Sequence, residues 1–515
     1  MNLKASITPV LILALILCSP AGIYPQTAFP RLEPDQKALE YHRLGVNKNH
    51  SWDELAAISL WASTGEPSPS DPKSGGGSAD NGGANSSNLE KIKAAVSILN
   101  NSAEIPSSQR EKAEYILTFM HSNFLKRYSL YQTRVDTLLS FGTYNCVSSA
   151  ALYIIFCNSA GLRTSAVITK EHAFVIVHID GLDIDVETTN RYGFDPGNRK
   201  EFHDQFGKLT GFSYVPAQNY RDRQTIENIE LISLILNNKI SDYERRSNFA
   251  DPVPLAVDRA ALLLGSSFEV TEQAYASEFL FTDPRRDLMD RLLNYGASLL
   301  KSNKEEEGIR WAVSASARYS DPVRWNNFLH AAVNNRIARF IRDRKIKEAE
   351  DFLENNKSHI SKADYDQLDS VIADADLLIR ANNIITAADG DAVVSGIEQA
   401  RNGGRISEKR ASELLTFAIQ KTASLLCASP GRNWRAAIAY LEKALYQYGV
   451  NRDLEQTMRT YKNNLAAEYH NRFAAEWNKK NYGAAEQILN EGLEQFPDNR
   501  QLLSDRQIVN RYYQQ

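Results

Sequence analysis

The chain has 515 residues, of which 43% are hydrophobic and 24% are charged, and its formal net charge is −4. This length allows two or three domains with packed cores, and four cysteines are too few for a small scaffold held together by disulfides. Because acidic and basic residues are nearly balanced and interspersed, the composition gives no reason to expect a nucleic-acid partner.

The N-terminus has the three regions of a secretory signal. Lys4 precedes an apolar run that ends near Cys18, and small residues follow as far as Ala21. We therefore predict a signal peptide over residues 1–21, with Cys18 as a lipidation candidate of the bacterial lipoprotein type and cleavage after Ala21 as the rival interpretation. We expect export to the periplasm or cell envelope, with membrane contact only through this signal or a lipid anchor.

Two short segments follow the signal. Residues 22–64 are predicted to hold a short helical segment, in which Ser51 and Glu54 have the spacing of a capping box. Residues 65–88 consist mostly of Gly, Ser, Pro and Asn, and almost no apolar side chain is available for burial. This composition predicts a disordered linker, which would tether the following region flexibly to its N-terminal attachment.

An apolar stretch that begins at Cys146 predicts a helix as far as Ala160. Asn145 precedes it as a plausible N-cap, and Gly161 follows it as a stop. The first turn of a helix offers N–H groups without intrahelical acceptors, together with the positive end of the helix dipole. Both favour a thiolate, so Cys146 is a candidate nucleophile, whereas Cys157, about three turns further along, is interpreted as a core residue.

The segment from Thr164 to Thr189 predicts antiparallel strands. β-Branched and aromatic residues flank an Asp-Gly pair at positions 180–181, which is the pattern of a hairpin. His172 stands at the start of one predicted strand and Glu187 near the end of the next. Either Glu187 or the alternative acid Asp185 can orient the imidazole of His172, because side chains two apart share one face of a strand.

A cysteine at a helix start, then a histidine and an acid on successive strands, resembles the transglutaminase-like branch of the papain-like thiol enzymes. The resemblance covers roughly residues 88–222. It implies an α+β fold with a papain-like/transglutaminase-like core over residues 89–222, in which the helix that carries the cysteine packs on an antiparallel sheet. It also implies that Cys146 is the nucleophile, His172 the general base and acid, and Glu187 the orienting residue, in place of the more usual Asp.

The sequence does not identify which group donates a hydrogen bond to an oxyanion. The backbone N–H of Cys146 is expected to contribute, together with Tyr144, Asn145 or Gln132. We expect no cofactor and no metal, because the sequence has neither a paired-cysteine or HExxH zinc pattern nor an EF-hand.

Helical patterns recur over residues 223–515 and predict an α-helical repeat array. Two of its segments resemble second helices of tetratricopeptide repeats, with Pro497 closing the last unit. The positions that match are Ala437, Leu441 and Ala444 in one segment and Ala485, Leu489 and Gly492 in the other. The small residues fit either ordinary helix packing or a concave face that binds a protein partner.

The sequence supports two functions of different classes. The first is an exported transglutaminase-like thiol enzyme that acts on amide bonds of peptides or proteins through Cys146, His172 and Glu187, by hydrolysis or by acyl transfer. The alternative is a catalytically silent transglutaminase-like fold that serves as a protein-binding scaffold through its tetratricopeptide-like repeats.

Overall fold

The computed structural model describes most of the chain beyond the predicted signal. The predicted signal and its lipidation candidate Cys18 lie outside the described residues, as do residues 65–80 of the predicted linker, whereas residues 81–88 belong to a helix. The described residues are 29–46, 49–64, 81–170, 172–197, 202, 207–208, 223–267, 283–428 and 433–514.

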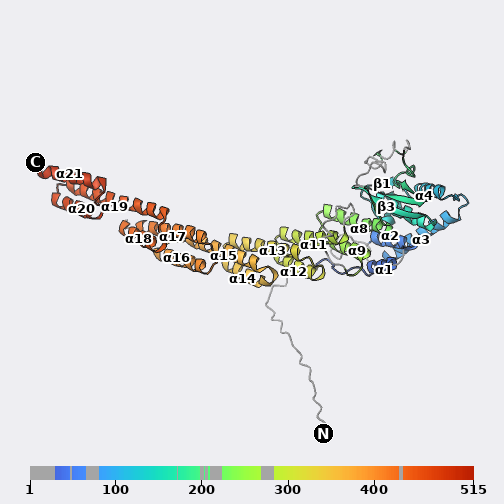
Figure 1. Cartoon of the computed structure of the whole chain (residues 1–515), viewed down its shortest axis with the longest axis horizontal. Coiled ribbons are helices and arrows are strands. Elements are labelled where there is room, and N and C mark those ends of the chain that lie inside the picture. The colour runs from blue at the N-terminus through green and yellow to red at the C-terminus, as the bar shows by residue number, and fades with distance from the viewer. Residues whose placement is uncertain are drawn as a thin grey trace, which may run out of the picture. The chain divides into compact units, whose positions relative to one another are not determined.

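The chain divides into two compact units, Met1–Ser298 and Leu299–Gln515 (Figure 1). The helices of the first unit are α1 (Gln36–Gly45), α2 (Trp52–Thr64), α3 (Asn81–Asn101), α4 (Gln109–Asn123), α5 (Val135–Phe141), α6 (Cys146–Ser159), α8 (Asn228–Arg245) and α9 (Pro252–Leu264). Its strands are β1 (Arg127–Tyr128), β2 (Thr143–Tyr144), β3 (Arg163–Ile168), β4 (Ala173–Ile179), β5 (Leu182–Val186) and β6 (Gln224–Ile226). Helix α11 (Pro284–Lys301) runs across the division.

Helix α6 is the centre of the first unit. Every residue from Cys146 to Cys157 is buried, which is the behaviour expected of a helix that is apolar all round. Helices α2, α3, α4, α5 and α8 contact it, and so do strands β3 and β4. The predicted helix is confirmed, including its Asn145 N-cap.

A four-stranded antiparallel sheet lies beside α6, with the strand order β5-β4-β3-β6. The hairpin predicted around residues 180–181 is confirmed: β4 pairs with β5, and His178 lies opposite Asp183. Asp180 and Gly181 both have positive φ, as a tight turn requires. A second, two-stranded sheet pairs β1 with β2 in parallel and leads into the start of α6.

Helix α8 is held in place from two sides. The Lys239 ammonium donates to the carbonyls of Ala62 and Ser63 at 3.1 and 3.2 Å, at the C-terminal end of α2. The Asn238 amide donates to the hydroxyl of Thr133 at 3.1 Å. Burial lowers the pKa of Lys239 to about 8, with a further lowering from Arg134. These contacts place α8 within the first unit, beyond the domain end predicted at residue 222.

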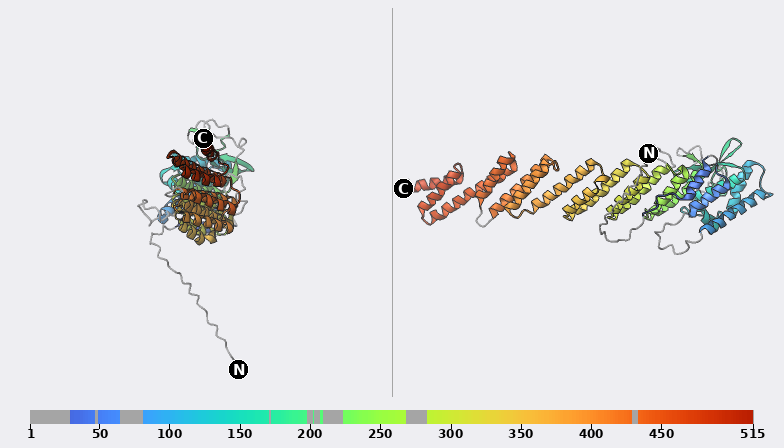
Figure 2. Two further views of the ribbon diagram at one scale, coloured as in Figure 1. Left: turned by 90° about the vertical axis from the view of Figure 1, so that its left-hand side faces the viewer. Right: turned by 90° about the horizontal axis from the view of Figure 1, so that it is seen from below.

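In its described residues, the second unit consists of helices alone. Consecutive helices contact one another along the unit, and Figure 2 shows them side by side. They are α12 (Glu305–Arg318), α13 (Pro322–Arg342), α14 (Ile346–Asn355), a 3-10 turn (Lys357–His359), α15 (Lys362–Asn382), α16 (Ala387–Asn402), α17 (Glu408–Ala428), α18 (Trp434–Tyr448), α19 (Arg452–Asn478), α20 (Tyr482–Gln495) and α21 (Arg500–Gln514).

The predicted fold class is wrong. The structure is 72% helical and its sheets are small, so it is a mostly helical protein and not an α+β protein with a sheet-packed papain-like core. The prediction extended a correct local hairpin to a whole domain. Other helices cover most of the central helix α6, and the sequence did not predict this because the contacts join segments far apart in the chain.

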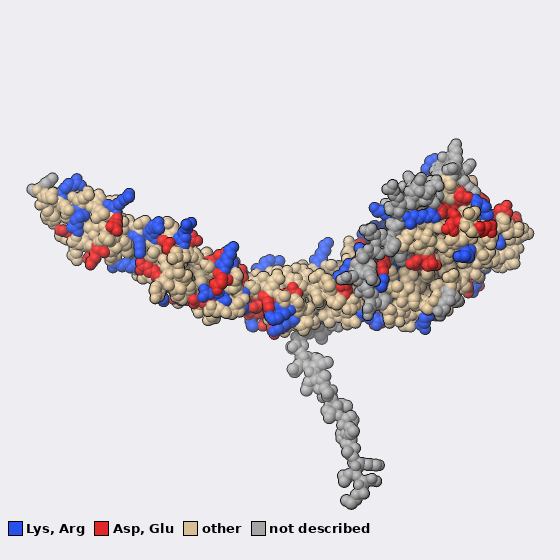
Figure 3. All heavy atoms as spheres, viewed as in Figure 1, with Lys and Arg blue, Asp and Glu red and all other residues tan. Residues whose placement is uncertain are grey.

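The surface carries charges of both signs. Basic and acidic side chains are interspersed on the face shown in Figure 3, in keeping with the small net charge. Within the described part of the chain, no helix combines the length and the apolar character that crossing a bilayer requires.

Gly390 makes the close approach of α16 to α17 possible. A Cβ atom at this position would lie 1.9 Å from the hydroxyl oxygen of Thr422, which is fully buried and β-branched. We expect Gly390→Ala to lower the free energy of unfolding by about 1–3 kcal/mol through overpacking. Urea denaturation followed by circular dichroism measures this change.

Gly396 in the same helix is the matched control. Its added Cβ would meet only a Leu377 methyl at 3.5 Å, an ordinary contact. Gly396→Ala is therefore expected to raise the free energy of unfolding by about 0.5–1 kcal/mol. Equal effects of the two substitutions would contradict the packing described for α16 and α17.

Candidate active site

Cys146 lies at the first residue of α6, where a capping box fixes the start of the helix. The side chain of Asn145 accepts a hydrogen bond from the Ser148 backbone N–H at 3.0 Å, and the Ser148 hydroxyl oxygen accepts one from the Asn145 N–H at 2.9 Å. The residue is 8% exposed. The sheltered thiol therefore lies at the N-terminus of α6, where the positive end of the helix dipole stabilises a thiolate.

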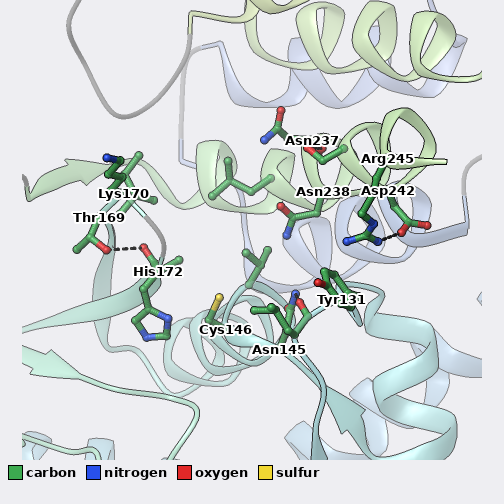
Figure 4. A pocket seen from close by; sticks show the side chains of 16 residues that line it. Tyr131, Asn145, Cys146, Thr169, Lys170, His172, Asn237, Asn238, Asp242 and Arg245 are labelled. Atoms are coloured by element: carbon green, nitrogen blue, oxygen red, sulfur yellow. Dashed lines mark hydrogen bonds and ion pairs between the residues drawn. The ribbon is translucent and has the colours of Figure 1, made fainter. Parts of the chain in front are cut away.

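His172 is held beside this thiol by the connection between β3 and β4. The Thr169 backbone N–H donates to the His172 carbonyl at 2.8 Å, which closes the turn just before β4 begins. The imidazole Nε2 is 2.6 Å from a carboxylate oxygen of Glu187, and the Cys146 side chain lies near the ring (Figure 4). Of the two predicted partners of the imidazole, Glu187 therefore contacts it directly and Cys146 lies near it.

The pKa of His172 is raised well above its ordinary value. Burial opposes the charged form, but the negative charge of Glu187, its hydrogen bond to the ring and the neighbouring Cys146 outweigh the effect of burial. The folded protein therefore favours the charged imidazolium more than water does. A protonated ring next to a thiol at a helix N-terminus favours the thiolate-imidazolium pair on which thiol enzymes depend.

Glu187 follows β5 directly and is 1% exposed. One carboxylate oxygen accepts from His172, and the other accepts from the Thr189 hydroxyl at 2.7 Å and the Thr189 backbone N–H at 3.2 Å. A buried carboxylate needs such partners to offset the loss of water. Glu187 is therefore fixed in position by the backbone that follows it.

Asp185, the alternative acid, points to another partner. Both of its carboxylate oxygens accept hydrogen bonds from the Arg223 guanidinium, at 2.5 and 2.7 Å. Of the two acids considered, the structure places Glu187 at His172 and Asp185 in this ion pair.

The three predicted oxyanion donors are engaged elsewhere. Gln132 donates to the carbonyls of Arg134 and Thr143, the Tyr144 hydroxyl donates to the Thr189 carbonyl, and the Asn145 amide donates to the Leu130 carbonyl. These side chains shape the loops around the nucleophile. The donors that remain from the prediction are the backbone N–H of Cys146, as the first residue of a helix, and the second amide N–H of Asn145, which no described hydrogen bond uses.

Tyr128 was missed by the sequence analysis. Its hydroxyl is buried and has no hydrogen-bond partner among the described residues. Burial raises its pKa, and the charges of Cys146 and Glu187 raise it further, which places the ring in their neighbourhood. No sequence pattern marked Tyr128, since only the folded chain pairs it in β1 with Tyr144, just before the nucleophile.

The thiol and the imidazole line a cavity of about 360 Å3 (Figure 4). One wall is the β3–β4 connection with Thr169 and Lys170, and the facing wall is α8. Most of the α8 lining is polar, and its residues recur at helical spacing: Leu234, Asn237, Asn238, Ser241, Asp242 and Arg245. This wall was not predicted from the sequence, because the predicted domain ended at residue 222, before α8.

Tyr131 and α8 meet at one end of this cavity. The Arg245 guanidinium lies over the Tyr131 ring, 3.9 Å from its centroid, and also forms an ion pair with Asp242. The contact ties the loop after β1 to the C-terminal end of α8 (Figure 4).

Because Gly193 has no Cβ, the turn after β5 can approach the Glu187 backbone closely and fix its position. The Glu187 N–H donates to the Gly193 carbonyl at 2.8 Å, and a Cβ on Gly193 would lie 1.9 Å from the Glu187 carbonyl oxygen. Because that neighbour is backbone, Gly193→Ala must displace Glu187. We expect the alkylation rate of Cys146 by iodoacetamide to fall in this variant, while the exposed neighbour change Tyr192→Ala leaves it unaltered. A folded Gly193→Ala protein with an undiminished rate would refute the role given to the turn.

No family model and no curated protein matches the chain. Among solved structures it is similar to menin, described as "Crystal structure of menin reveals the binding site for Mixed Lineage Leukemia (MLL) protein", with 12% identity over 94% of this chain and 97% of that chain. The TM-score of 0.31 is too low to carry an argument.

The predicted membership of the transglutaminase-like family, with a tetratricopeptide-like array, is therefore wrong. The mostly helical structure with small sheets overturns it, and no family model supports it. The residue order that carried the resemblance is a local feature of α6 and the β3–β5 strands, and it does not define the fold of the chain.

Proposed function

We propose that the protein is a thiol enzyme in which Cys146 attacks an acyl carbonyl, His172 transfers protons and Glu187 orients the imidazole. The observation that carries the proposal is the arrangement of the three side chains: His172 Nε2 is 2.6 Å from Glu187, and the imidazole and the Cys146 thiol line one cavity (Figure 4). A nucleophile beside a base that an acid orients is the geometric signature of this chemistry.

The reaction proceeds in two steps. The thiolate of Cys146 adds to the carbonyl carbon, the carbonyl electrons move to oxygen, and on collapse the bond to the leaving amine breaks while His172 protonates that amine. A thioester remains on the sulfur. Water or an acceptor amine, deprotonated by His172, then attacks the thioester and releases the thiolate, which gives hydrolysis or acyl transfer.

Each residue has a separate electrostatic task. The N-terminus of α6 and the imidazolium favour the thiolate, and the backbone N–H of Cys146 can donate to the developing oxyanion. Glu187 accepts the Nε2–H of His172, which leaves the opposite ring nitrogen, Nδ1, for the proton exchanged with sulfur and substrate. No metal or cofactor is needed for these steps.

The proposed substrates are amide bonds of peptides or proteins in the cell envelope. The cavity beside Cys146 supports this class, because the amide oxygen of Asn238 and the hydroxyl oxygens of Ser241 and Thr169 can accept hydrogen bonds from amide N–H groups. The expected export rests on the signal predicted at residues 1–21.

Iodoacetamide alkylation of Cys146 tests the proposal. We expect adducts at this residue in the folded full chain, located by peptide mapping, and a rate at neutral pH at least about tenfold lower in His172→Ala, because the thiolate loses its cation. Glu187→Gln should also slow the reaction. Asp185→Asn is the matched control, since that acid pairs with Arg223. An inert Cys146 would reject the enzyme and favour the protein-binding alternative.

The raised pKa of His172 predicts a specific pH dependence. NMR of the imidazole carbon-bound proton should show the ring still protonated well above pH 6.5 in the wild type, and losing its proton at lower pH in Glu187→Gln. Because the folded pKa lies above the unfolded one, the stabilisation from this pair is complete below about pH 6.5 and is lost as the pH rises through the folded value. Identical titration of His172 in both proteins would contradict the assignment of Glu187.

A further inference from the structure

A second row of hydrogen-bonded side chains crosses the same sheet away from Cys146. Ser165 on β3 has its hydroxyl oxygen 2.8 Å from Nε2 of His178 on β4, and Nδ1 of His178 is 2.7 Å from a carboxylate oxygen of Asp183 on β5. The antiparallel register explains the order, because His178 pairs directly with Asp183 across the hairpin. The sequence analysis gave these three residues no role together.

Asp183 determines which tautomer neutral His178 adopts. A carboxylate at Nδ1 requires a proton on that nitrogen, so neutral His178 carries its lone pair on Nε2 and accepts the hydrogen bond from the Ser165 hydroxyl. This is the tautomer in which an imidazole can take a proton from a serine. Nucleophile, base and orienting acid are thus connected in the right sequence of atoms.

Ser165 and His178 line a cavity of about 540 Å3 in the first unit, distinct from the cavity at Cys146. Its apolar wall includes Leu55, Leu262 and Leu263, which provides room for a hydrocarbon group. The cavity has a polar side as well, and its lining there includes Arg163, Asn158 and Asn228.

The N-terminus of α8 also lines this cavity. Asn228 and Ile229 are the first two residues of that 18-residue helix, and backbone N–H groups at these positions have no intrahelical acceptor. The Glu227 backbone N–H donates to the Glu230 side chain at 2.7 Å, and no described hydrogen bond uses the N–H groups of Asn228 and Ile229. They are suitable donors to an oxyanion.

We propose that Ser165, His178 and Asp183 form a second hydrolytic site that cleaves carboxylic esters with a small apolar acyl group. The Ser165 oxygen bonds to the ester carbonyl carbon while its proton moves to Nε2 of His178. The bond to the alkoxide then breaks, and His178 protonates the alkoxide to give the alcohol. Water, deprotonated by His178, attacks the acyl-serine, and the acid and the free hydroxyl are released.

Exposure of the acid favours esters over amides as substrates. Asp183 is 66% exposed and the side chain of His178 is 27% exposed, so solvent screens the charge that supports the imidazolium. An alkoxide leaves more readily than an amine and therefore demands less of the base and acid.

The test uses the full chain with Cys146→Ala, which removes the thiol. An alkyl fluorophosphonate labels an activated serine, because the serine oxygen displaces fluoride from phosphorus and the base takes the proton. The adduct is mapped by mass spectrometry, and hydrolysis of p-nitrophenyl butyrate is measured in parallel. Circular dichroism shows whether each variant is folded.

We expect the adduct on Ser165, and loss of labelling and hydrolysis in Ser165→Ala. His178→Gln should lower hydrolysis by about 10²-fold or more. Asp183→Asn, at an exposed position, should lower it less, while Asp180→Asn in the same hairpin should have no effect. No adduct at Ser165, or unchanged hydrolysis in folded Ser165→Ala, would overturn the proposal.

Discussion

The buried hydrogen bond between His172 and Glu187 is the interaction on which the candidate active site depends. A carboxylate that is 1% exposed cannot stay charged without partners, and this one has three: the imidazole at 2.6 Å and two donors from Thr189. Removal of one partner of such a buried pair typically costs about 3–5 kcal/mol. The same pair holds the imidazole next to the thiol at the start of α6, so the stability of the turn after β5 and the chemistry of Cys146 are coupled.

The β4–β5 hairpin positions two histidine–carboxylate pairs. His172 and Glu187 lie at its open end and are buried, whereas His178 and Asp183 lie near its turn and are more exposed. Because side chains alternate along a strand, a one-residue slip of the register would turn these side chains to the opposite face. The Asp-Gly turn at positions 180–181 therefore fixes the geometry of two separate rows of polar groups.

Local signals in the sequence predicted the parts of the site that depend on local structure. The Asn145 cap, the start of α6 and the hairpin follow from capping chemistry, apolar patterning and turn residues, and the structure has all three. The choice between Glu187 and Asp185 required the position of Arg223. This residue lies directly before β6, 38 residues further along the chain than Asp185. The oxyanion candidates bind loop carbonyls through their amides and hydroxyl, and only the folded chain brings these carbonyls near. The helical character of the whole protein, and the α8 wall of the cavity, depend on long-range packing that no local pattern records.

The most direct test of the central claim is the ultraviolet absorbance of the thiolate in the folded full chain. If Cys146 and His172 form an ion pair, the wild type shows thiolate absorbance at pH 7 that Cys146→Ser lacks and that His172→Ala greatly reduces, since Cys157 and Cys427 are buried and burial raises the pKa of both thiols. Equal absorbance in all three proteins at pH 7, with thiolate appearing only near the ordinary cysteine value of about 8.5, would contradict it.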